Sequence, residues 1–149
     1  VWNKIYRASK IKNVLFEKDK CNEDEFWSYL ALAECEKYVA VDYYGYAYFQ
    51  REDSIMGNSY SRKRLDAVKA KIERCKYIKT NFPALFAKAK TNLIATCIYH
   101  GQLSLKYLPE SEKKQAFDFL TTNKDHWKTT GDVLTFDDTA LFPSFLSLG

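Results

Sequence analysis

Two short polar segments of this chain carry residue types that could do chemistry. The first is residues 22–26, Asn-Glu-Asp-Glu-Phe, which opens a predicted helix and offers Glu23 and Asp24. A carboxylate held on a rigid element could act as a general base and take the proton from an attacking hydroxyl. Helix capping alone would also explain both side chains, because the amides at a helix N-terminus stabilise negative charge. Residue type and spacing by themselves favour capping.

The second segment is residues 50–55, Gln-Arg-Glu-Asp-Ser-Ile, at the end of a tyrosine-rich stretch. Gln50, Arg51 and Ser54 offer an amide, a guanidinium and a hydroxyl, which together could clamp a phosphate or the hydroxyls of a sugar. An exposed turn with an ion pair between Arg51 and a neighbouring carboxylate explains the pattern equally well.

Aromatic residues make up 16% of the chain, which is more than a minimal core needs and favours a surface that stacks on rings or sugars. Tyr44, Tyr46 and Tyr48 share one face of a predicted strand. Packing within a sheet is the default interpretation of these tyrosines, and a sugar-stacking platform is the minority alternative.

The elements that would position these residues follow from the hydrophobic pattern. In the first part of the chain the pattern predicts short helices and strands, with Asn22 and Glu25 as a capping box. The predicted helices lie within 1–11 and at 23–37. The predicted strands lie at 14–16, 38–41 and 46–49.

From Tyr60 onward the pattern becomes helical. Apolar residues recur at spacings of three and four, which predicts a first helix. They are Leu65, Val68, Ile72, Cys75 and Ile78. A second helix is expected to begin at Pro83 and to stop at Pro109, and a third covers 111–120. We therefore expect an α+β, mostly helical fold, in which a mixed sheet segment at about 1–57 is followed by a helical bundle at 58–149.

Charge and cysteine usage narrow the function classes. The net charge of +4 is too small for a nucleic-acid footprint. The four cysteines have no Cys-x-x-Cys spacing, so free thiols in a reducing cytosol are favoured over a zinc site. His100 falls on an apolar stripe and is expected to be a core histidine. The Ser-Arg-Lys-Arg segment at 61–64 is expected to begin a solvated helix face. No apolar run reaches the roughly 20 residues of a membrane span, and the expected location is the cytoplasm.

Four segments in this order resemble the family 2 glycosyltransferases of bacteria, which have a GT-A fold and build surface polysaccharides. They are Val-Trp-Asn-Lys-Ile-Tyr-Arg at 1–7, Leu-Phe at 15–16, Asn-Glu-Asp-Glu-Phe at 22–26, and the strand end at 46–55. The resemblance covers about residues 1–55, and it rests on the order and spacing of all four segments. It identifies 1–57 as the acceptor-side portion of a catalytic domain and 58–149 as a helical extension.

The resemblance also implies roles for individual residues. Asp24 would be the catalytic base of an inverting transfer, with Glu23 as the adjacent candidate. Gln50, Arg51 and Ser54 would lie near the diphosphate or the acceptor. The acceptor side of the pocket would be formed with help from Trp2, Asn3 and Lys4. The substrates would be a nucleotide sugar and a carbohydrate acceptor, and the full-length enzyme would use Mg²⁺ or Mn²⁺.

Two departures from the family limit these expectations. First, Phe49 stands where the family often has Arg. Second, the nucleotide-binding half with its Asp-x-Asp metal site is missing. No metal is therefore expected here, and residues 1–149 alone should not transfer sugar. Homo-oligomerisation and peripheral association with the inner face of the membrane stay open. A helical protein-interaction module without a catalytic role is the alternative, and Asp24→Asn in the full-length enzyme separates the two.

Overall fold

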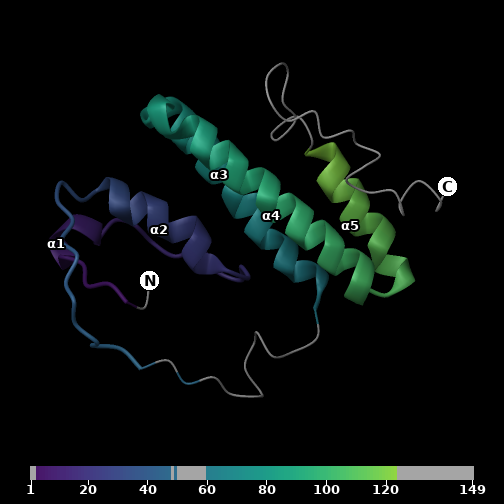
Figure 1. Cartoon of the computed structure of the whole chain (residues 1–149), viewed down its shortest axis with the longest axis horizontal. Coiled ribbons are helices and arrows are strands. Elements are labelled where there is room, and N and C mark those ends of the chain that lie inside the picture. Colours follow the sequence, from purple (N-terminus) through teal and green to yellow (C-terminus); the bar gives the residue numbers. More distant parts are fainter. Residues whose placement is uncertain (1–2, 48, 50–59, 124–149) are drawn as a thin grey trace. The chain divides into compact units, whose positions relative to one another are not determined.

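The computed structural model describes residues 3–47, 49 and 60–123 of the chain. The chain divides into two compact units, Val1–Ser59 and Tyr60–Gly149, which we describe separately. Most of the described residues are helical, which confirms the prediction of a mostly helical fold (Figure 1).

The first unit contains two described helices, α1 at Ala8–Ile11 and α2 at Glu23–Ala33. The helix α2 buries Phe26, Trp27 and Ala31, which recur at spacings of one and four residues along one face. The segments before α2 pack on this face through aromatic side chains. A small aromatic cluster therefore organises residues 3–33.

The described part of the second unit consists of helices joined by short turns. Its elements are η1 at Arg62–Leu65, α3 at Asp66–Asn81, η2 at Pro83–Leu85, α4 at Phe86–Tyr107 and α5 at Glu110–Thr122. The long helix α4 packs against α3 and against α5. The α3–α4 turn and the α4–α5 turn lie at opposite ends of this unit (Figure 1).

One hydrophobic core joins the helices of the second unit. Val68 and Leu93 are completely buried, and Leu120 is nearly so. The residues of this core come from every long helix of the unit: Leu65, Val68, Ile72, Cys75, Leu93, Ile94, Cys97, Leu108, Ala116 and Leu120. Four of the five apolar positions that predicted the first helix are among them, so the predicted apolar face is the face that packs.

Prolines set the helix boundaries of the second unit, as predicted. Pro83 occupies the first position of η2, where its missing N–H costs no hydrogen bond. Leu108 is extended, with φ −75° and ψ 146°, because the residue before a proline avoids the helical region. Pro109 then serves as the N-cap residue of α5. The third helix, predicted at 111–120, extends slightly further at both ends.

The strands predicted at 14–16 and 38–41 are wrong, because no strand occurs among residues 3–47, 49 and 60–123. The described residues of the strand predicted at 46–49 are also irregular, whereas Tyr48 lies outside the described residues. β-Propensity reflects packing on a sheet, and an unpaired strand leaves its backbone groups without partners. Val39 and Val41 are accordingly 72% and 74% exposed. The mixed sheet expected at about 1–57 is not formed by the described residues.

The predicted helices of the first unit are longer than the observed ones. The helix expected within 1–11 covers only Ala8–Ile11, and Ile5 is fully exposed before it. The helix expected at 23–37 ends at Ala33. The capping box is also wrong, because Asn22 adopts the left-handed conformation, with φ 59° and ψ 45°, and its side chain makes no capping bond. Asparagine tolerates this conformation better than most residues do.

Candidate functional site

The candidate catalytic carboxylates lie on the first turn of α2, as predicted. Glu23 is exposed and Asp24 is half-buried. Glu25 follows them on the same turn, so three acidic residues meet the positive end of the helix dipole. The hydroxyl of Ser28 donates to the backbone carbonyl oxygen of Asp24 at 2.5 Å. The turn presents carboxylates from a helix rather than from a loop, which suits a group that must be held in place.

Trp27 fixes this acidic turn to the segments before it. Its Nε1 donates to the carbonyl oxygen of Val14 at 2.7 Å, and its ring stacks on Phe16 with centroids 4.6 Å apart. Tyr6 contacts the same indole edge-on at a centroid distance of 5.1 Å. Trp27 lies three residues after Asp24, which places the two on adjacent positions of the helix surface. These contacts therefore set the orientation of the turn that carries Asp24.

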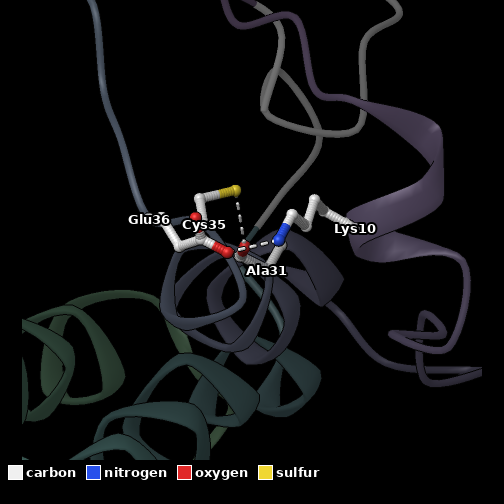
Figure 2. Close-up of polar contacts among 4 residues, drawn as sticks. All are labelled: Lys10, Ala31, Cys35 and Glu36. Carbon is white, nitrogen blue, oxygen red and sulfur yellow. Dashed lines mark hydrogen bonds and ion pairs between the residues drawn. The ribbon is translucent and has the colours of Figure 1, made fainter.

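The C-terminal end of α2 is held by side chains that satisfy its last carbonyls. The thiol of Cys35 donates to the carbonyl oxygen of Ala31 at 3.3 Å (Figure 2), and the hydroxyl of Tyr38 donates to that of Leu32. Helix ends leave such carbonyls without partners inside the helix. Both ends of α2 thus have defined contacts within the first unit.

An ion pair connects α1 to the residues that follow α2. Nζ of Lys10 lies 2.5 Å from Oε1 of Glu36 (Figure 2). The hydrogen bond and the charge of Lys10 lower the pKa of the Glu36 carboxyl. Both side chains are exposed, so this pair orients the chain more than it stabilises it.

The described part of the chain contains four of the eight predicted site residues. Asn3 and Lys4 are exposed, and Nζ of Lys4 lies 2.8 Å from Oδ1 of Asn3. They precede Tyr6, which contacts Trp27, so these residues and the pair Glu23 and Asp24 belong to the same unit. The other four predicted residues lie outside the described residues. They are Trp2, Gln50, Arg51 and Ser54.

The tyrosines expected to pack in a sheet are exposed where the structure describes them. Tyr44 is 98% exposed and Tyr46 is 54% exposed, whereas Tyr48 lies outside the described residues. Tyr44 and Tyr46 therefore do not pack within a sheet, which was the default interpretation of these side chains.

The described residues do not form a metal site around the acidic turn. Among residues 3–47, 49 and 60–123, no group of three or more His, Cys, Asp or Glu side chains could hold a metal ion. The divalent ion that the glycosyltransferase resemblance implies does not fit the described residues.

A buried polar cluster in the second unit was only partly predicted. The hydroxyl of Tyr60 lies 2.9 Å from Nδ1 of His100, 3.2 Å from the carbonyl oxygen of His100 and 3.4 Å from Oγ of Ser104. His100 and Ser104 are buried, which confirms the prediction of a core histidine. The sequence signal for Ser104 was its place four residues after His100 on one helix face, whereas nothing local indicated Tyr60.

Burial shifts the titration of this cluster and of the nearby thiols. It lowers the pKa of His100 to about 4, and the positive charge of Arg64 acts in the same direction. Burial also raises the pKa of the Tyr60 hydroxyl, and it raises that of Cys97 to about 12. A neutral imidazole and a protonated thiol at neutral pH fit a structural role in the core, because a reactive cysteine needs its thiolate.

The predicted basic face is solvent-exposed at its start. Arg62 and Lys63 are exposed, and the guanidinium of Arg64 lies 5.9 Å from the centre of the Tyr60 ring.

None of the described helices is both long enough and apolar enough to cross a membrane.

Comparison with known proteins returned no relative. No protein-family profile matches the chain, and neither a curated protein nor a solved structure is significantly similar to it.

Proposed function

We propose that residues 1–57 are the acceptor side of a glycosyltransferase, which moves a sugar from a nucleotide sugar to a carbohydrate hydroxyl during bacterial surface polysaccharide synthesis. The observation that carries the proposal is the order and spacing of the four segments that resemble family 2 glycosyltransferases. The geometry supports it in one respect. Two of those segments contain Tyr6 and Phe16, and Trp27 directly follows a third. The Trp27 ring contacts both other rings.

In the proposed reaction, Asp24 removes the proton from the acceptor hydroxyl as that oxygen attacks the anomeric carbon of the donor. The bond from this carbon to the diphosphate breaks, and the diphosphate leaves with the bonding electron pair. Asp24 is suited to this role because it is half-buried on a rigid turn, whereas Glu23 is exposed beside it. Asn3 and Lys4 would contact the acceptor.

We propose that residues outside these 149 bind the donor. The sequence contains no Asp-x-Asp motif, which in the family binds the metal ion that stabilises the leaving diphosphate. We therefore propose that residues 1–149 act as part of a longer chain and that they transfer no sugar on their own.

The decisive experiment is Asp24→Asn in the full-length protein. We expect sugar transfer to fall by about a thousandfold or more, because the amide cannot accept the proton. Binding of the nucleotide sugar and the far-UV circular dichroism spectrum should remain unchanged. Glu34→Gln is the matched control, because it makes an acid-to-amide change at an exposed residue at the other end of α2, and its transfer rate should stay close to that of the parent. Unchanged transfer by the Asp24→Asn protein would contradict the assignment.

A second candidate function is a helical interaction module, and the self-contained core of residues 60–123 favours it. In that case the helices bind a partner protein, and the segment before them has no catalytic role. Asp24→Asn should then leave every activity of the full-length protein unchanged.

A further inference from the structure

The tip of the helical hairpin formed by α3 and α4 combines exposed apolar side chains with a high local positive charge. This tip, residues 76–90, contains the end of α3, the turn η2 and the start of α4. Phe82 is 42% exposed and Leu85 is 53% exposed. The two flank Pro83 and Ala84, which are exposed as well, so four consecutive residues of the turn face solvent.

Lysines surround this apolar turn on both helices. Lys76 and Lys79 are exposed on α3, and Lys88 is exposed on α4. Nζ of Lys79 lies 5.6 Å from the centre of the Phe86 ring, so the two helices meet directly below the turn. The tip therefore combines exposed apolar side chains with exposed lysines on both helices.

Acidic side chains are absent from the sequence around the tip. Between Arg74 and Pro109 the chain has five lysines and no Asp or Glu. The acidic residues of α5, such as Glu110 and Asp118, belong to a helix that packs on α4 and begins at the opposite end of the unit (Figure 1). Residues 76–90 themselves carry four lysines and no acidic residue, so the tip has a local excess of positive charge.

We propose that the α3–α4 tip binds the surface of an anionic lipid bilayer, with Phe82 and Leu85 entering the boundary between headgroups and acyl chains. Lys76, Lys79 and Lys88 pair with the anionic headgroups around them. Lysines near an anionic membrane surface strengthen binding electrostatically, and apolar side chains at the interface add to it.

The geometry favours a bilayer over other polyanions or a protein. Binding of duplex nucleic acid would use the lysines but would leave Phe82 and Leu85 without a role. A protein partner requires a surface of complementary shape, whereas a bilayer accepts a protruding turn. The proposal concerns residues 76–90 alone and does not depend on glycosyl transfer.

Vesicle flotation of residues 1–149 tests the proposal. We expect binding to phosphatidylcholine vesicles that contain phosphatidylglycerol and at least about tenfold weaker binding to pure phosphatidylcholine. Added salt should weaken the binding. Absence of binding to the anionic vesicles, or equal binding to both kinds, would overturn the proposal.

The apolar part is tested by the double variant Phe82→Ser and Leu85→Ser. Its matched control is Tyr99→Ser with Tyr107→Ser, because these tyrosines are 58% and 52% exposed on α4 away from the tip. We expect the tip variant to bind anionic vesicles about tenfold more weakly and the control to bind as the parent does. Equal binding by both variants would exclude insertion of the turn. Circular dichroism verifies that each variant folds.

The charged part is tested by Lys76→Glu with Lys88→Glu, against Lys63→Glu with Lys114→Glu. Both pairs change the net charge equally, and all four side chains are exposed. The tip pair should reduce vesicle binding by more than about tenfold, and the control pair should reduce it much less. Equal losses, or duplex DNA binding as tight as vesicle binding, would show a general polyanion surface and would refute the proposal. Asp24→Asn should bind vesicles normally, so this test and the test of transfer fail independently.

Discussion

The two units of the chain achieve order in different ways. In the second unit, ten buried residues from η1 to α5 form one core, and residues far apart in the sequence contact one another. In the first unit, Trp27 contacts two other aromatic rings and donates a hydrogen bond to a backbone carbonyl oxygen. Residues 38–47 of the same unit are exposed. Helices can satisfy their own backbone groups, whereas strand-forming sequence needs a neighbouring strand. A helical segment therefore reaches a defined fold with fewer partners.

The largest difference between the units should appear on truncation of an apolar side chain. Leu93→Ala removes a completely buried side chain from α4, and we expect the free energy of unfolding to fall by about 3 kcal/mol. Leu15→Ala in the first unit removes a side chain that is 79% exposed, and it should have almost no effect. Urea denaturation followed by circular dichroism measures both. Similar losses for the two variants would contradict the proposed contrast.

Stability should depend on pH through the second unit. The pKa of His100 is about 4 in the folded chain, below its ordinary value of 6.5, so the unfolded chain binds the proton more readily between these values. The contribution of neutral His100 to the free energy of unfolding should therefore be complete above pH 6.5. As the pH decreases towards 4, the free energy of unfolding should fall by on the order of 2 kcal/mol. His100→Asn should remove this contribution. Identical pH profiles for the parent and the variant would exclude His100 as its source.

The first unit should respond to a change at its tryptophan. Trp27→Phe retains an aromatic ring beside Phe16 and Tyr6 but removes the hydrogen bond to the Val14 carbonyl. We expect a loss of about 1 kcal/mol that is confined to the first unit. Amide hydrogen exchange should become faster in α2 and stay unchanged in α3 and α4. Faster exchange throughout both units would show that they are energetically coupled.

The smallest effect is expected at the exposed ion pair of the first unit. Lys10→Ala should leave the thermal unfolding midpoint unchanged within error, since both members of the pair face water. The pKa of Glu36 should rise towards its ordinary value, which nuclear magnetic resonance titration of the carboxyl can measure. A pKa that stays low in this variant would show that another group causes the shift.

The sequence allowed prediction of the helical unit because its signals are local. The spacing of Leu65, Val68 and Ile72 reports one buried face, and Pro83 and Pro109 act on the backbone at their own positions. The contact of Tyr60 with His100 could not be predicted, because the two residues are 40 positions apart and no local pattern links them. Long-range contacts of this kind are decided by packing.

The same reasoning explains what the sequence did and did not predict in the first unit. The valines and tyrosines of residues 38–47 have the composition of a strand, yet composition does not supply the neighbouring strand that pairing requires. The helix that carries Glu23 and Asp24 was predicted because its apolar face is a local feature, although the capping box that was expected to begin it does not form. The support of that turn by Val14 and Phe16 depends on how residues 3–22 fold back on α2, and spacing gave no indication of it.

The placement of the four cysteines has a practical consequence. Cys75 and Cys97 are buried in the second unit, whereas Cys21 and Cys35 are partly accessible in the first. A maleimide dye should therefore label the native chain only in its first unit, without prior removal of any cysteine. A fluorescence donor placed there, with an acceptor in a vesicle membrane, would report how far the first unit stands from the lipid. The chain's own thiols thus provide a means to measure the arrangement of its two units at a surface.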